Sequence, residues 1–302
     1  MAGSRFEPDR GLTSRMLMTM FLLGLVYVVF MAALIALRIP WLLLLIIVVG
    51  FGLFQYFASD KIALFSMNAR EVSPEQAPDL HAVIDRLCAQ ADMSKPRVAI
   101  ADTDVPNAFA TGRSEKASVI CVTTGLLRRV DLNELEGVLA HELSHVAHRD
   151  VAVMTIASFL GLLAGIVTRF GLQFGLFGGG RGRDNNTFLI FMLTVLISAI
   201  VYAISFLLTR ALSRYRELAA DRAAALLTGR PSALASALTK ISGDMARIPT
   251  RDLRKAEPMN AFFFAPAISR GFSLSSLFST HPPLERRLEQ LAQISRQLGK
   301  GA

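Results

Sequence analysis

The residues best suited to chemistry form the segment His141-Glu142-Leu143-Ser144-His145, which has the pattern His-Glu-x-x-His. On a helix, residues four apart share one face about one turn apart. Both imidazoles can therefore bind the same zinc ion while Glu142 lies beside them and activates a water molecule. The chain has only five histidines among 302 residues, which makes a chance match rare. The pattern predicts a zinc site with His141 and His145 as ligands and Glu142 as general base.

A catalytic zinc ion needs a third protein ligand and an open position for water. His148 is nearest, but it lies seven residues from His141, about 10.5 Å along a helix axis, so we exclude it. Farther along the chain, Glu217 and Asp221 lie four residues apart on one helical face. We expect Glu217 to bind zinc and Asp221 to accept the free N–H of a ligating histidine, which fixes its tautomer. The alternative is ordinary ion pairing with neighbouring arginines on a solvated face.

The elements that must position these residues can be predicted from the polar segments. Asp131 begins the motif helix, and Glu134 three residues later completes a capping-box pattern. Upstream, 97–101 and 118–122 are short β-rich runs that indicate a small sheet. A helix should start at Ser73-Pro74-Glu75 and run to about Ala91. The polar parts therefore predict an α+β domain around the motif helix.

The composition is that of a membrane protein, with 52% hydrophobic residues, 19% charged residues and a mean hydropathy of +0.44. These values exclude a disordered chain, and two cysteines are too few for a disulfide scaffold. About 20 apolar residues cross a bilayer, and four stretches without charge predict four membrane-spanning helices: 16–37, 39–58, 151–168 and 188–209. A signal anchor is the alternative for the first. The third is expected to continue from the motif helix as one helix, and Gly161-x-x-x-Gly165 within it permits close helix contact.

Arginines beside the spans indicate topology rather than nucleic-acid binding, although the net charge is +8. They place the N-terminus and both large polar stretches in the cytoplasm. The turn between the first two spans has a single arginine, Arg38, and the loop 169–187 is the one segment that conflicts, because it carries three arginines on the opposite side. The predicted division is an N-terminal hairpin, a cytoplasmic part with the motif, a second pair of spans, and a cytoplasmic part that completes the site: 1–58, 59–150, 151–209 and 210–302. The sequence does not fix the oligomeric state.

Taken together, the chain resembles the HtpX-type integral-membrane zinc metalloproteases, which are gluzincins related to the CAAX prenyl endopeptidases. The resemblance rests on the four spans, the motif helix before the third span, and three further segments: 106–112 (Pro-Asn-Ala-Phe-Ala-Thr-Gly), Arg216-Glu217-x-x-Ala220-Asp221, and 279–287 (Ser-Thr-His-Pro-Pro-Leu-x-x-Arg). It implies a zincin-like domain and one zinc ion per chain. It also implies an endopeptidase of the bacterial inner membrane, active on the cytoplasmic side in quality control of misfolded or damaged membrane proteins, with polypeptide substrates and the lipid bilayer as partners.

Further residues are expected to serve such an enzyme. The resemblance makes His281 a donor to the transition state, on a rigid mount before Pro282-Pro283; a helix-capping role is the alternative. Arg287 is expected to pair with Asp221 or Glu217. An extended substrate would add to an exposed sheet edge at 118–122, with Asn107 and Ala108 as substrate-binding residues, although Asn107 also suits a simple turn after Pro106.

Two alternatives stay open at this point. One is a processing protease for prenylated or other defined peptides, which would use the same chemistry. The other is a membrane chaperone whose zinc is structural. Structural zinc sites are closed sets of four ligands rich in cysteine, and neither Cys88 nor Cys121 lies near the motif in the sequence. The pattern therefore favours an open, catalytic site.

Overall fold

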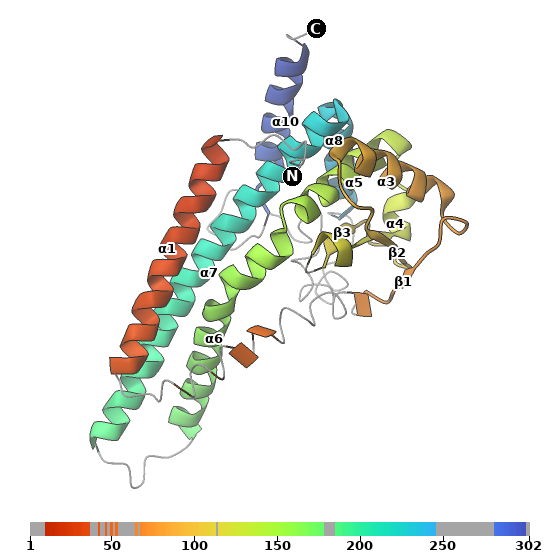
Figure 1. Cartoon of the computed structure of the whole chain (residues 1–302). Coiled ribbons are helices and arrows are strands. Elements are labelled where there is room, and N and C mark those ends of the chain that lie inside the picture. The colour runs from red at the N-terminus through yellow and green to blue at the C-terminus, as the bar shows by residue number, and fades with distance from the viewer. Residues whose placement is uncertain are drawn as a thin grey trace.

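The structure is a computed structural model that describes residues 10–36, 67–112, 114–177, 185–245 and 281–299, with a few single residues between 42 and 65. Three long helices lie at one end of the molecule, and shorter helices and a sheet form the other end (Figure 1). The fold is therefore mainly α with a small mixed sheet, as the sequence predicts.

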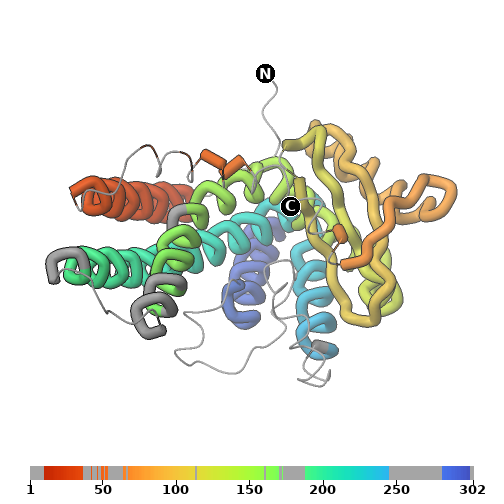
Figure 2. Tube along the Cα trace, turned by 90° about the horizontal axis from the view of Figure 1, so that it is seen from below, coloured from red at the N-terminus to blue at the C-terminus, as the bar shows by residue number. Residues whose placement is uncertain are grey.

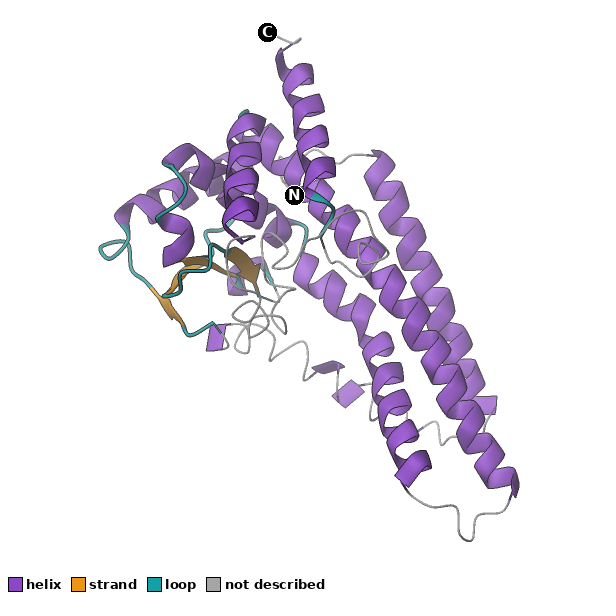
Figure 3. Ribbon diagram, turned by 180° about the vertical axis from the view of Figure 1, so that it is seen from behind, coloured by secondary structure: helices purple, strands orange, loops and turns teal. Residues whose placement is uncertain are grey.

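The long helices α1 (Arg10–Ala36), α6 (Asp150–Phe177) and α7 (Asn185–Thr228) contain the apolar stretches. Each has a segment long and apolar enough to cross a bilayer: Arg10–Ala36, Asp150–Arg169 and Phe188–Thr228. These match three of the four predicted spans, and Figure 3 shows the helices lying along one another. The remaining span, 39–58, lies largely outside the described residues.

Two glycines allow α6 to approach α7 closely, as their spacing predicts. A Cβ atom at Gly161 would lie 2.8 Å from the Cβ of Ser205, and one at Gly165 would lie 2.9 Å from the ring of Tyr202. Such distances are shorter than real contacts, so any larger residue would push the helices apart. Tyr27 of α1 adds a hydrogen bond of 2.5 Å to the carbonyl of Ala157, which ties α1 to this pair.

The motif helix α5 (Leu132–Ala147) is separate from α6, although one continuous helix was expected. The chain turns at Arg149, which has a φ of 55°, a left-handed conformation that ends a right-handed helix. The expectation was wrong because hydropathy alone does not reveal a single left-handed residue. The turn brings Asp150, the first residue of α6, back beside the end of α5.

Four strands form one sheet in the order β1-β2-β4-β3. The predicted runs correspond to β2 (Arg97–Ala101) and β4 (Val119–Thr123), which pair in parallel. The sequence analysis missed β1 (Ala69–Glu71), antiparallel to β2, and β3 (Ala108–Thr111), antiparallel to β4. Both are short, and β3 is rich in alanine, so neither has the β-branched composition by which strands are predicted.

This strand order corrects the expected sheet edge. Segment 118–122 is not exposed, because β4 lies between β2 and β3, hydrogen-bonded on both sides. Every residue of β4 is buried, as expected for an apolar central strand. The edge next to α5 is β3 instead.

The helix α3 (Pro78–Ala91) begins later than the expected start at Ser73-Pro74-Glu75. Residues 74–76 form a turn, in which the side chain of Gln76 accepts a hydrogen bond from the amide of Ser73. Pro78 explains the difference, because proline inside a helix loses a hydrogen bond and disfavours helical geometry in the preceding residue. Ala77 accordingly has a non-helical φ of −143°.

One hydrophobic core joins the two polar stretches of the chain. It contains apolar side chains of α3, β2, β4 and α5 together with those of α8 (Pro231–Met245) and α10 (Leu284–Gly299). Gly137 permits α5 to approach α8 closely, because a Cβ there would lie 3.2 Å from the backbone of Leu234 in α8. Figure 2 shows the sheet at one end of the molecule and α1, α6 and α7 at the other. This core fixes α5 against the C-terminal part of α7, which contributes Ala224 and Ala225.

Candidate metal centre

The start of α5 is fixed by the predicted capping box. The Asp131 carboxylate accepts hydrogen bonds from the amides of Asn133 and Glu134, at 2.9 and 3.0 Å, and the Glu134 carboxylate accepts one from the amide of Asp131 at 2.9 Å. This reciprocal arrangement confirms the predicted boundary. A fixed start also fixes the helical phase, so His141 and His145 face the same side, with their Nε2 atoms 3.1 Å apart.

The third group of the centre comes from α7. Glu217 Oε2 lies 3.6 Å from Nε2 of His141, and Glu217 Oε1 lies 3.5 Å from Nε2 of His145. Ligand atoms about 2.0–2.2 Å from a tetrahedral zinc ion are about 3.3–3.5 Å apart. The three residues form the group of metal-ligating side chains found among the described residues, and their spacing fits a zinc ion. Among the described residues, no further His, Cys, Asp or Glu joins this group.

A buried chain of charges orients His141. Its Nδ1 lies 2.9 Å from Oδ1 of Asp221, one helical turn beyond Glu217. Arg287 of α10 binds the same carboxylate with two hydrogen bonds, at 2.7 and 2.6 Å. The exposed fractions of the Asp221 and Arg287 residues are 0% and 1%. Burial opposes the charged form of His141, but the hydrogen bonds and negative charges of Asp221 and Glu217 together outweigh it and raise the pKa of His141 to about 9.

The sequence analysis missed the corresponding partner of His145. The Nδ1 atom of His145 lies 2.7 Å from Asp150, whose carboxylate also forms an ion pair with Arg216 of α7. Arg216 also donates to the carbonyl of His148 at 3.2 Å. Asp150 lies five residues after His145, a spacing that no continuous helix would align. Only the turn at Arg149 brings His145 and Asp150 together, so their spacing in the sequence did not predict this contact.

Glu142 lies beside His141 and His145 on α5. Its side chain is buried, and this burial raises the pKa of the Glu142 carboxyl above its ordinary value. Burial also lowers the pKa of His145, which favours the neutral imidazole that a metal requires. A carboxyl whose pKa lies closer to neutrality is better matched to accepting and returning a proton. The Glu142 Oε2 atom accepts a hydrogen bond of 2.9 Å from the amide of Ala110 in β3.

That hydrogen bond shows which edge of β3 faces the centre. Backbone groups in an antiparallel strand alternate between the two sides, so Ala108 presents its amide and carbonyl on the same outer side as Ala110. Asn107 faces the other way, because its amide and carbonyl pair with the side chain and amide of Thr123, both at 2.9 Å. Asn107 is fully buried. The structure therefore brings Ala108 to the site and keeps the Asn107 backbone in the sheet.

Two of the three other histidines, His281 and His148, occupy different places. His281, just before α10, is buried with Nδ1 2.9 Å from Oε2 of Glu217. It reaches the centre, and its nearest carboxylate is the third group of the metal cluster. His148 lies beyond the end of α5 with Nδ1 2.7 Å from the carbonyl of Ser144, outside the cluster, in agreement with its exclusion by helical geometry.

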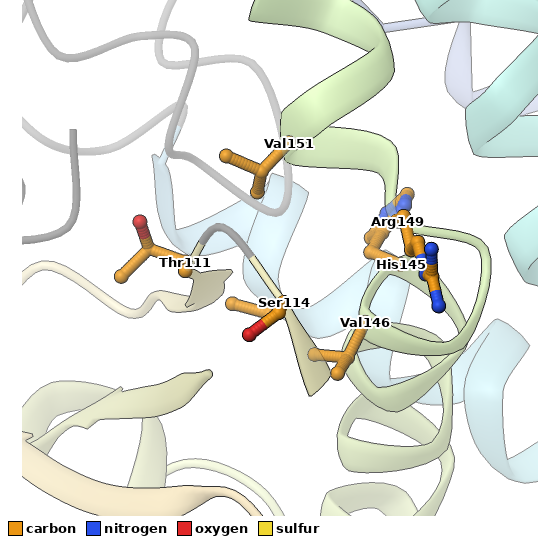
Figure 4. A pocket seen from close by; sticks show the side chains of 8 residues that line it. Thr111, Ser114, His145, Val146, Arg149 and Val151 are labelled. Atoms are coloured by element: carbon orange, nitrogen blue, oxygen red, sulfur yellow. The ribbon is translucent and has the colours of Figure 1, made fainter. Parts of the chain in front are cut away.

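A cavity of about 550 Å³ opens over the centre, lined by β3, by His141, Glu142, His145, Glu217 and His281, and by parts of α6 and α7. A smaller hollow lies beside it, where the end of β3 meets the α5–α6 turn. Figure 4 shows Thr111 and Ser114 on one side of this hollow and His145, Val146 and Arg149 on the other. The outer side of β3 therefore runs directly past α5.

Fold and site together define a membrane-spanning metalloprotease. The model of peptidase family M48 matches residues 74–295. The protease HtpX homolog 1 of Streptomyces coelicolor is 61% identical over 98% of this chain and 97% of its own length. The protease HtpX homolog of Moorella thermoacetica is 53% identical over 96% of each chain. The chain belongs to peptidase family M48, which confirms the predicted resemblance to the HtpX-type proteases.

A solved structure supports the same fold. The crystal structure of S. mikatae Ste24p matches with a TM-score of 0.55 and 19% sequence identity, over 94% of this chain and 66% of that chain. The chain thus spans slightly less than two thirds of the length of Ste24p. At this identity the match concerns the fold alone.

Proposed function

We propose that this metalloprotease holds one zinc ion per chain through His141, His145 and Glu217 and cleaves polypeptides with Glu142 as general base. The observation that carries the proposal is the spacing of the three groups, 3.1, 3.5 and 3.6 Å between the two Nε2 atoms and the Glu217 carboxylate oxygens, which is within a few tenths of an ångström of the spacing of ligand atoms around tetrahedral zinc. Two nitrogen donors and one carboxylate are a known catalytic ligand set.

The chemistry then divides between the ion and the protein. Zinc, when bound, lowers the pKa of water and polarises the scissile carbonyl. Glu142 takes the proton of the attacking water and returns it to the leaving amine, a task that its buried position and raised pKa support. Asp221 and Asp150 keep each imidazole protonated at Nδ1, which leaves Nε2 of both histidines for the metal.

Substrate binding follows from the orientation of β3. An extended peptide can add to this edge as a further strand, with hydrogen bonds to the outward amide and carbonyl of Ala108. Asn107 would support this strand from within the sheet through its two bonds to Thr123. Recognition through the backbone accepts many sequences, which suits an enzyme that removes misfolded or damaged proteins.

His281 is proposed to stabilise the oxyanion of the transition state. Its position in the wall of the cavity and its 2.9 Å contact with Glu217 support a place beside the reacting groups. A positioned donor of this kind contributes a factor of about 10² to 10³ to kcat. A role limited to orienting Glu217 is the alternative, and it would show as lost zinc.

The proposed setting is the cytoplasmic side of a bacterial inner membrane, with misfolded or damaged membrane proteins as substrates. The arginines before the first predicted span, 16–37, and after the predicted span 188–209 support this orientation by the positive-inside rule. The proposal keeps four spans, with 59–150 and 210–302 together forming the catalytic part. A cysteine can be placed at the exposed position of Glu75. If a reagent that cannot cross the membrane labels this cysteine in intact cells, the topology is wrong.

Casein digestion by the detergent-purified protein tests the chemistry. Glu142→Gln should abolish digestion and keep full zinc content, whereas Glu217→Ala should lose the zinc. Glu136→Gln is the matched control, since Glu136 lies on the same helix but pairs with Arg86 at 2.9 Å. It should keep both activity and zinc. Digestion that persists in Glu142→Gln, or full zinc content in Glu217→Ala, would contradict the proposal.

A further inference from the structure

The cavity over the metal centre continues into the membrane-spanning helices. Its wall includes residues of α6 from Val151 to Leu162 and of α7 from Tyr202 to Glu217. At 1.5 Å per residue, it extends along about 22 Å of α7, from Glu217 to Tyr202. The part of this wall that lies farther from Glu217 belongs to the apolar spans that begin at Asp150 and Phe188. Peptide hydrolysis at the metal centre does not require a cavity of that depth.

Hydroxyl groups follow this part of the wall. Tyr202, Ser205, Thr209 and Ser213 lie three or four residues apart and form one stripe on α7, and Thr155 and Ser158 face them from α6. The opposite side of α7 carries exposed apolar side chains, of which the last two lie level with the stripe: Leu193, Leu196, Ile200, Ile204 and Leu207. The hydroxyl groups therefore belong to the cavity side of α7 and not to its lipid side.

The far end of the cavity lies at the surface of the helix pair. Leu162 and Tyr202 line it, and each is 43% exposed. The two helices pack closely at Gly161, against Ser205, and at Gly165, against the ring of Tyr202, so the cavity runs along one side of this contact. A chain from the bilayer can thus enter beside Leu162 and Tyr202 and reach Glu142 through one continuous space.

The chemistry of the wall indicates what occupies it. An extended peptide within a bilayer leaves its amides and carbonyls unpaired, at a cost of several kcal/mol for each group. A hydroxyl can donate or accept, and one that already donates, as Ser158 does to the carbonyl of Thr155 at 3.3 Å, still has an oxygen that accepts. An acyl chain has no polar groups and would gain nothing from these hydroxyls.

We propose that the part of the cavity lined by α6 and α7 is a binding subsite for the unfolded, apolar end of a membrane-protein substrate, which the hydroxyl stripe keeps hydrogen-bonded between the bilayer and β3. The inference rests on the proposed proteolytic function and adds a second place of substrate contact. Arg210 stacks on Phe206, 4.8 Å from the ring centroid, and lines the cavity at the end of the stripe nearer the metal centre. The substrate would pass it as it leaves the apolar part.

Photo-crosslinking tests occupancy directly. In the Glu142→Gln protein, Tyr202 is replaced by p-benzoylphenylalanine, and Leu196, 56% exposed on the lipid side of α7, is replaced in a control. The probe is a model substrate with one apolar span of about 20 residues joined to an unfolded polar tail, in phosphatidylcholine nanodiscs. Position 202 should crosslink to the span of the probe at least tenfold more than position 196. Equal yields, or crosslinks from 202 to lipid alone, would overturn the proposal.

Kinetics give an independent test. Leu162→Trp narrows the subsite, and Ile156→Trp, 72% exposed on the same helix and outside the cavity wall, is the matched control. Leu162→Trp should lower kcat/KM for the anchored probe at least tenfold more than for its tail alone, whereas Ile156→Trp should change neither. An equal loss on both substrates would refute the subsite. Cleavage of the tail by the wild-type protein reports the proteolytic function separately, so failure of one proposal is distinguishable from failure of the other.

Discussion

Removing the Arg287 side-chain charge should destabilise the protein and weaken metal binding at the same time. In Arg287→Met, Asp221 would stay fully buried with His141 as its remaining partner among the contacts described above. Breaking a buried ion pair by removing one member costs about 3–5 kcal/mol, because the other charge is left uncompensated. At about 2–4 °C per kcal/mol for proteins of 150–250 residues, Tm should fall by roughly 6–20 °C.

The measurement needs two readouts. Thermal unfolding in detergent is followed with a chelator present, because bound zinc would itself raise Tm. Zinc affinity is measured separately by competition with a metal-sensitive dye, and it should fall by about 10- to 100-fold, the usual effect of disturbing a group that orients a ligand. Arg286→Met is the control, since Arg286 is the exposed neighbour in the same helix, and it should change neither quantity.

A double variant separates the two effects. In Asp221→Asn with Arg287→Met no buried charge is left alone, so the protein should be more stable than Arg287→Met. Zinc affinity should stay low, because the carboxylate that orients His141 is gone. A Tm for Arg287→Met within 2 °C of the wild-type value, or a double variant less stable than this single one, would refute the interpretation of the pair as a buried, coupled charge system.

Three further predictions follow from the site and the core. His281→Ala should lower kcat for casein by about 10² to 10³ while zinc content stays at the wild-type level; unchanged kcat would refute the donor role. Asp150→Asn should weaken zinc binding by about 10- to 100-fold in the dye assay, because Asp150 holds His145 at 2.7 Å, and equal affinity would show that this contact is dispensable. Cys88 and Cys121 should resist iodoacetamide in the folded protein at pH 8, since burial raises their pKa values to about 11 and about 12; rapid labelling without denaturant would contradict the buried core.

The sequence was informative where one local pattern decided the outcome. Asp131 and Glu134 cap α5 as their spacing predicts, and the four-residue spacing of Glu217 and Asp221 puts both carboxylates against the motif helix. It was uninformative where a single backbone conformation or a long-range pairing decided. The left-handed Arg149 moves Asp150 next to His145, and β3 becomes a strand only because β4 offers it a partner. The partner of Arg287, left open between two carboxylates, depended in the same way on how α10 packs.

The length of α7 has a mechanical consequence. Its 44 residues form one rod of about 66 Å, embedded in lipid at one end and carrying Glu217 and Asp221 at the other. A tilt of about 5° in the lipid-embedded half would displace Glu217 by on the order of 2 Å over a lever of 22 Å, ten times the tolerance of about 0.2 Å in a metal–ligand distance. Tilting is one way in which a long apolar helix adjusts to the thickness of its bilayer. A change in bilayer thickness that tilted α7 would therefore move Glu217 relative to His141 and His145 without any change in the residues of the site.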